Sequence, residues 1–144
     1  MKSERESKMK ISRNKAREQA FLILFQKTFD REATLAELVE KGTKQGNITE
    51  NDFTYQLCKL AFEQMEEIDE VMAKNAEKWN FDRISKVAIS VLRLAIAEIK
   101  FVDDIPLRVS LNEAIELTKK FSGEEEASFV NGVLAGIVQD SKKA

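Results

Sequence analysis

The chain has 144 residues, of which 43% are hydrophobic and 33% charged, and its formal net charge is −2. A chain of this length buries a core large enough to fold without a disulfide or a structural metal, and its composition excludes wholesale disorder. It has no histidine and a single cysteine, Cys58, which excludes a Ser-His-Asp or Cys-His catalytic arrangement, an internal disulfide and a CxxC metal or redox site.

The first predicted elements are a basic arm and two helices. Residues 1–11 are expected to form a mobile basic arm, and helical spacing of apolar residues extends from Ser12 to about Phe29. A second helix is predicted to begin at Thr34, because Thr34 and Glu37 have the spacing of a capping box, and to end near Gly42. Few glycines and one proline interrupt the chain, which favours helix throughout.

The middle of the chain is predicted to form two further helices. Thr49 and Asp52 indicate a capped helix start. The apolar face of the helix that follows consists of Phe53, Leu57, Leu60, Ala61 and Met65, and helical spacing continues through Ile68, Val71, Met72 and Trp79 to Asn80. Cys58 falls on this apolar face, so we expect a buried structural thiol rather than a reactive one.

The C-terminal part is predicted to form three helices. From about Arg83 to Phe101 the chain is apolar on most sides, which is typical of a central helix, and Pro106 follows its end. Ser110 and Glu113 have capping-box spacing for the next helix. The apolar stripe of the last helix consists of Val130, Val133, Leu134, Ile137 and Val138. The sequence therefore predicts an all-α fold of about seven helices, with an N-terminal subdomain over 12–80 and a C-terminal subdomain over 81–144.

The pattern of polar residues argues against catalysis. The glycines match neither a dinucleotide-binding nor a P-loop motif, and neighbouring carboxylates such as Glu66 and Glu67 point apart on a helix. We therefore expect a protein that is not an enzyme and uses no cofactor and no metal; a catalyst built from carboxylates and lysines is the alternative. No stretch approaches the roughly 18 apolar residues of a membrane span, and the charged N-terminus lacks a secretory signal, which predicts a cytoplasmic protein.

Positive charge is concentrated at the N-terminus. Residues 1–17 carry seven positive and two negative charges, whereas the rest of the chain carries 16 positive and 23 negative ones. Five of these cations follow one another without an intervening acid: Lys8, Lys10, Arg13, Lys15 and Arg17. Cations at the start of a helix do not benefit from its dipole, so the cluster indicates a polyanionic partner such as RNA or DNA. A solubilising tail is the alternative.

Three segments of the chain resemble the NusB family. Residues 15–26 (KAREQAFLILFQ) are similar to the family's opening ARxxAxxxLYQ pattern, and residues 91–99 (VLRLAIAEI) are similar to its LRLAxYEL helix. Residues 105–134 resemble its IP…INEAIELAKKF…FVNGVL series. Order and spacing agree over roughly residues 12–140.

This resemblance implies two packed helical bundles that bind the boxA element of nascent ribosomal RNA transcripts together with NusE, a ribosomal protein, in the RNA polymerase antitermination complex. The residues that it places against RNA are Lys8, Lys10, Arg13, Lys15, Arg17, Phe25, Glu125 and Phe129. The five cations would contact phosphates, Phe129 would stack on a base, and Glu125 would accept a hydrogen bond from a base edge. Helical spacing by itself instead favours a core position for Phe129.

Other functions fit the same sequence. One is an accessory domain of a ribosomal RNA cytosine methyltransferase, because such enzymes carry NusB-like domains. Another is a module that binds only its ribosomal partner, in which case the basic arm is a tail. The residues that would contact NusE are not indicated by the sequence, and self-association into a homodimer through the apolar helices is a further alternative.

Overall fold

The described chain is helical throughout. The computed structural model describes residues 11–76 and 84–141. Within these ranges the helices are α2 (Arg13–Phe29), α3 (Leu35–Lys44), α4 (Asp52–Glu63), α5 (Met65–Asn75), α6 (Lys86–Phe101), α7 (Leu107–Phe121) and α8 (Glu124–Ser141), and there is no strand. The predictions of an all-α fold and of seven helices are confirmed for this part of the chain. The arm residues 1–10 and the predicted boundary at residues 80 and 81 lie outside the described residues.

Two helix starts lie where the sequence places them. The Ser12 side chain accepts a hydrogen bond from the Lys15 backbone N–H at 3.1 Å and caps α2. Thr34 and Glu37 form the predicted capping box of α3, because the Glu37 N–H donates to Thr34 Oγ1 at 3.1 Å and the Thr34 N–H donates to Glu37 Oε1 at 2.8 Å. The first backbone N–H groups of a helix have no partner within the helix, and these cap side chains accept hydrogen bonds from them. Both helix starts are therefore determined by residues close together in the sequence.

Two other predicted caps are wrong. The N-cap of α4 is Asn51, whose Oδ1 accepts from the Thr54 N–H at 2.8 Å, whereas Thr49 lies two residues before the cap. Helix α7 begins directly after Pro106, so Ser110 lies inside the helix and is buried. Proline is well suited to the start of a helix because its φ is already fixed, and this allows α7 to begin earlier than the Ser110 pattern suggests.

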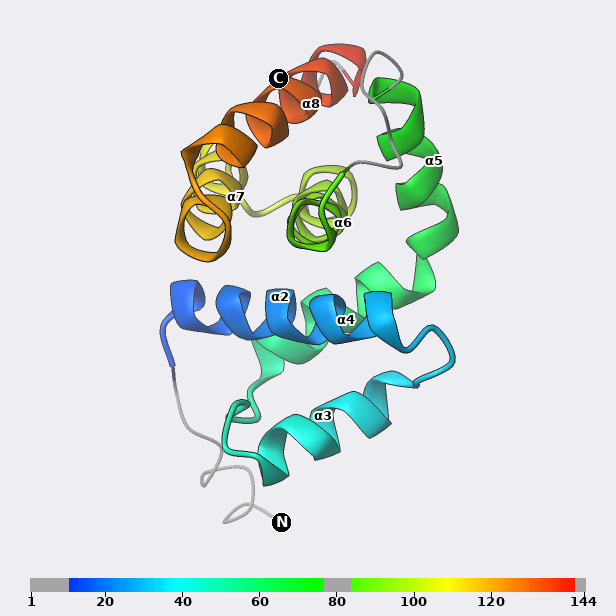
Figure 1. The fold of residues 1–144 in the computed structure, drawn as a ribbon, viewed down its shortest axis with the longest axis vertical. Coiled ribbons are helices and arrows are strands. Elements are labelled where there is room, and N and C mark those ends of the chain that lie inside the picture. Colours follow the sequence, from blue (N-terminus) through cyan, green and yellow to red (C-terminus); the bar gives the residue numbers. More distant parts are fainter. Residues whose placement is uncertain (1–10, 77–83, 142–144) are drawn as a thin grey trace.

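Helix α6 lies at the centre of the molecule and packs against α2, α4, α5, α7 and α8 (Figure 1). Its sequence explains this position, since apolar residues occupy nearly every face. The largest fully buried side chains of α6 are Leu92, Leu94, Ile96 and Ile99. The predicted stripe of α8 faces the same core, with Val130, Val133, Leu134 and Ile137 buried. Burial of this broad apolar surface is the main favourable contribution to the fold.

The described helices are arranged in two groups. Helices α2, α3 and α4 form one layer, and α5, α7 and α8 surround α6 above it (Figure 1). Helix α5 packs against α6 and α8 through Ile68 and Met72, although it precedes the predicted boundary near residue 80. Gln64 is both the C-cap of α4 and the N-cap of α5, so the chain passes from one group of helices to the other at this residue. The apolar face of α5 decides this, because it completes the α6 core.

Candidate nucleic-acid interface

The first turn of α2 presents two cations to solvent. Arg13 and Lys15 are exposed, and this turn contains no acidic residue. The Arg13 guanidinium carbon lies 4.3 Å from the centre of the Phe53 ring, which holds the charged end of this side chain against α4. The N-terminal end of a helix carries a partial positive charge of its own, so cations and helix dipole add to one local positive potential.

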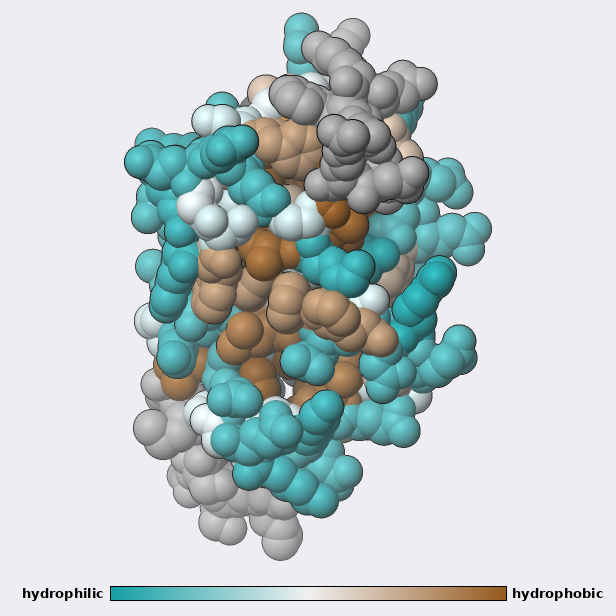
Figure 2. All heavy atoms as spheres, viewed as in Figure 1, coloured by the Kyte–Doolittle hydropathy of each residue, from teal (hydrophilic) through white to brown (hydrophobic). Residues whose placement is uncertain are grey.

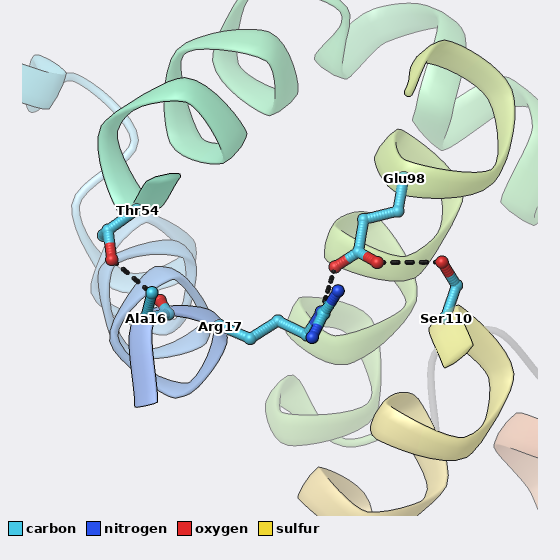
Figure 3. Close-up of polar contacts among 5 residues, drawn as sticks. All are labelled: Ala16, Arg17, Thr54, Glu98 and Ser110. Atoms are coloured by element: carbon cyan, nitrogen blue, oxygen red, sulfur yellow. Dashed lines mark hydrogen bonds and ion pairs between the residues drawn. The ribbon is translucent and has the colours of Figure 1, made fainter. Parts of the chain in front are cut away.

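Unlike Arg13 and Lys15, Arg17 is buried inside the protein. The residue is only 2% exposed, and its Nε donates to Glu98 Oε2 at 2.7 Å (Figure 3). The other oxygen of Glu98 accepts a hydrogen bond from Ser110 Oγ at 2.8 Å, which joins α2, α6 and α7 in one buried network (Figure 3). The Arg17 guanidinium is therefore buried and ion-paired in this structure, a position that does not favour the expected phosphate contact.

Further buried hydrogen bonds hold the start of α2 against α4. Thr54 Oγ1 donates to the Ala16 carbonyl at 2.9 Å (Figure 3). The Gln19 side chain makes two bonds with the backbone of Thr49, accepting from its N–H at 2.6 Å and donating to its carbonyl at 3.1 Å. The first two turns of α2 are thus held by α6 on one side and by α4 and the loop before it on the other. These contacts determine the position of the start of α2.

A row of phenylalanine rings runs along α2. Phe21, Phe25 and Phe29 recur every four residues and share one side of the helix. Ring centres are 5.9 Å apart for Phe21 and Phe25 and 5.0 Å apart for Phe25 and Phe29, and Phe121 of α7 extends the row at 4.8 Å from Phe21. Phe21 is buried and Phe25 half-buried, whereas Phe121 is 36% and Phe29 60% exposed. The row is thus anchored in the core and open at both ends.

A lysine accompanies each open end of this aromatic row. Lys120 Nζ lies 5.5 Å from the centre of the Phe121 ring, and Lys86 Nζ lies 5.6 Å from the centre of the Phe29 ring. Lys120 also pairs with Glu18 of α2 at 2.7 Å. On the face seen in Figure 2, apolar residues gather in the middle and hydrophilic residues surround them. Aromatic rings beside cations suit a ligand that has both flat bases and phosphates.

The start of α8 carries the remaining predicted residues. Glu125 is exposed and Phe129 is half-buried at the edge of the core, four residues further along the helix. Between them, Glu126 Oε1 accepts hydrogen bonds at 2.6 Å from Ser85 Oγ, the cap of α6, and from Ser122 Oγ. This shared carboxylate positions the start of α8 against the start of α6, so the orientations of Glu125 and Phe129 depend on it.

The structure thus sorts the predicted residues into three groups. Arg13, Lys15 and Glu125 face solvent, Phe25 and Phe129 are half-buried, and Arg17 is internal. Lys8 and Lys10 lie outside the described residues. Sequence reasoning missed Phe29, Phe121 and Lys86. The four-residue spacing of Phe21, Phe25 and Phe29 was an available signal for the first of these, whereas the contribution of α7 and α6 depends on tertiary packing.

Metal-binding and thiol chemistry in the described part of the chain depends on its acidic side chains and its single cysteine. Among them, no group of histidine, cysteine or acidic side chains is arranged to hold a metal ion. Cys58 is buried as predicted, and burial raises the pKa of its thiol far above the ordinary range. None of the helices within residues 11–76 and 84–141 has the length and apolar character needed to cross a membrane.

Comparison with proteins of known sequence identifies clear relatives. The NusB family model matches residues 14–139. The transcription antitermination protein NusB of Agathobacter rectalis is 41% identical over 128 residues, which cover 87% of this chain and 98% of that protein. The protein of the same name from Clostridium botulinum strain Kyoto is 42% identical over 144 residues, covering 89% of this chain and 100% of that protein.

Solved structures show the same similarity. A crystal structure of the antitermination factors NusB and NusE in complex with double-stranded RNA contains a chain that matches with a TM-score of 0.78 and 30% identity, covering 89% of this chain and 96% of that one. The solution structure of NusB from Aquifex aeolicus matches with a TM-score of 0.76 and 30% identity, covering 92% of this chain and 95% of that one. The helical arrangement in Figure 1 is therefore shared with these proteins.

Proposed function

The chain belongs to the NusB family, and we propose that it is a transcription antitermination factor that binds the boxA element of nascent ribosomal RNA transcripts together with NusE. The observation that carries the RNA-binding proposal is the exposed pair of cations, Arg13 and Lys15, on the positive end of α2. That the similar crystal structure contains NusB with NusE and RNA supports the choice of partners. In this role the protein acts in the cytoplasm as a non-catalytic part of the RNA polymerase antitermination complex.

Each predicted contact has its own chemistry. Arg13 and Lys15, with Lys8 and Lys10 of the arm, contact phosphates. Phe25 and Phe129 offer ring surface to unpaired bases, and the exposed carboxylate of Glu125 accepts a hydrogen bond from a base edge. Arg17 is excluded from these contacts and instead positions the start of α2 through Glu98. The phosphate contacts provide affinity, and the α8 residues provide base preference.

The test is fluorescence anisotropy of labelled single-stranded boxA RNA, titrated with the protein in the presence and absence of NusE across a series of salt concentrations. Affinity is expected to rise with NusE and to fall with salt. For single strands each phosphate contact contributes about 0.7 to the slope of log affinity against log salt. The double variant Arg13→Ala/Lys15→Ala is therefore expected to lower that slope by about 1.4.

A matched control removes two cations elsewhere. Lys41 and Lys44 are exposed in the last turn of α3, and the double variant Lys41→Ala/Lys44→Ala changes the net charge by the same amount. This control is expected to leave the slope within about 0.3 of the parent value. Equal losses in both double variants would mean that net charge alone attracts RNA. Binding of NusE without any preference for boxA over a scrambled RNA would instead favour a module that binds only protein.

A further inference from the structure

Phe29 is the most exposed large apolar side chain among the described residues, and it is one of the two open ends of a row of rings that Phe21 anchors in the core. It is 60% exposed and contacts Phe25 edge to face, with an interplanar angle of 77°. Exposed aromatic surface is costly in water, and the contact with Phe25 leaves most of the Phe29 side chain uncovered. Its position continues the row formed by Phe21 and Phe25, so a ligand that stacks at Phe25 meets Phe29 next.

Lys86 supplies the second observation. It is the first residue of α6, exposed, and its Nζ lies 5.6 Å from the centre of the Phe29 ring. A cation at the N-terminus of a helix is unfavourable for that helix. The first turn of α6 contains no acid of its own, although the Glu126 carboxylate of α8 is hydrogen-bonded to its cap, Ser85. The same placement of charge marks Arg13 and Lys15 at the start of α2. A ring and a cation thus come together from two elements far apart in the sequence.

We propose that Phe29 and Lys86 form a further nucleotide-binding site for single-stranded RNA, in which a base stacks on Phe29 and the adjoining phosphate contacts Lys86. The inference rests on the proposed function and adds a site that lies one helical turn beyond Phe25. Phe21 is buried, so only Phe25 and Phe29 of this helix offer ring surface to a ligand. From Phe25 to Phe29 the helix rises about 6 Å at 1.5 Å per residue. Bases stacked about 3.4 Å apart along one strand cover this length with about two or three nucleotides.

Stacking on an aromatic ring tolerates any base, because every base has a π face. The site is thus expected to strengthen RNA binding without changing which sequence is preferred. Base preference would remain with the residues of α8. An alternative occupant of the same apolar surface is NusE, which would make Phe29 a protein contact, and the test separates these two.

The variants are chosen so that the fold is not disturbed. Phe29→Ala removes the ring, Phe29→Leu keeps apolar area without a π face, and Phe29→Trp restores a larger ring. Tyr55→Ala is the matched control, because Tyr55 is a 51% exposed aromatic residue on α4. Lys86→Ala removes the cation. Each variant is titrated with labelled boxA RNA and with a scrambled RNA of equal length, and separately with NusE in the absence of RNA.

Phe29→Ala and Phe29→Leu are both expected to raise the Kd for either RNA about 5- to 10-fold, the lower part of the range for one stacked base. Phe29→Trp is expected to bind at least as tightly as the parent chain, and its indole fluorescence, measured against the parent chain, is expected to be quenched by RNA. Tyr55→Ala is expected to stay within twofold. Lys86→Ala is expected to weaken binding and lower the salt slope by about 0.7.

Three results would overturn the inference, and they differ from a failure of the proposed function. The first is a parent chain that binds boxA RNA while Phe29→Ala binds as well as Tyr55→Ala does. A second is Phe29→Leu binding as tightly as the parent chain, because apolar contact rather than stacking would then be sufficient. The third is a loss of NusE binding by Phe29→Ala without RNA. A parent chain that binds neither RNA would refute the proposed function itself, and this inference with it.

Discussion

The buried pair of Arg17 and Glu98 is expected to dominate the response of this fold to single substitutions. Glu98 is 1% exposed and has two partners, Arg17 Nε at 2.7 Å and Ser110 Oγ at 2.8 Å. Arg17→Met keeps an unbranched side chain in α2 but leaves the carboxylate buried with only the serine. Removing one partner of a buried ion pair costs about 3 to 5 kcal/mol, because the remaining charge has lost both water and its counterion.

This loss is large enough to measure directly. At about 2.1 cal/mol/K of unfolding entropy per residue, 144 residues give about 0.3 kcal/mol/K, so Arg17→Met is expected to lower Tm by about 10 to 16 °C. Ser110→Ala removes one hydrogen bond to a charged acceptor, which is worth about 1.5 to 3 kcal/mol, and is expected to lower Tm by about 5 to 10 °C. Arg17→Met combined with Glu98→Leu is expected to recover most of the loss, since an apolar replacement of a buried pair is often neutral.

The assay is thermal unfolding followed by circular dichroism, completed as a double-mutant cycle for Arg17 and Glu98. Arg93→Met is the control, because Arg93 makes two hydrogen bonds of 2.9 Å to Asp69 at a partly exposed site. A pair so accessible to water contributes about 1 kcal/mol or less. The RNA titration adds a second readout, in which Arg17→Met is expected to leave the salt slope unchanged.

One combination of results would refute this reasoning. If Arg17→Met costs less than about 1 kcal/mol, the buried pair does not make the contribution assigned to it. If the same variant also lowers the salt slope of RNA binding by about 0.7, Arg17 contacts a phosphate after all. The assignment of Arg17 as a buried residue that positions the start of α2 would then be wrong.

Two smaller predictions concern local features. Cys58 is expected to resist alkylation by iodoacetamide in the native protein and to react only as fast as the chain unfolds, because burial raises the pKa of its thiol; rapid native labelling at neutral pH would contradict this. Thr34→Ala is expected to destabilise the protein by about 1 kcal/mol, measured by urea unfolding, since it breaks the capping box. Hydrogen bonds from Thr34 lower the pKa of Glu37. The stabilising contribution of this carboxylate is therefore present above the ordinary glutamate pKa and is lost as pH falls through the lowered value. A destabilisation by Thr34→Ala that does not become smaller on acidification would argue against this coupling.

The local sequence determined most of the secondary structure. Apolar spacing predicted every described helix, and Ser12 and Thr34 mark their helix starts because cap hydrogen bonds involve residues only three positions apart. The unusual apolar content of residues 86–101 was sufficient to predict the central helix, since only a helix packed on most sides buries so many apolar groups. Where two local signals competed, as at Asn51 and Pro106, the sequence pattern selected the wrong residue.

The tertiary structure alone decided which charged and aromatic residues form the site. In sequence, Arg13, Lys15 and Arg17 are equivalent cations at the start of one helix, yet only Arg17 is buried. The reason is its partner Glu98, which lies 81 residues away and is itself unremarkable in an apolar helix. The proximity of Lys86 to Phe29 and the packing of α5 on α6 likewise depend on contacts between segments that are far apart in the sequence. Periodicity defines which face of a helix is apolar, but the neighbour that covers that face is decided by packing between segments distant in the chain.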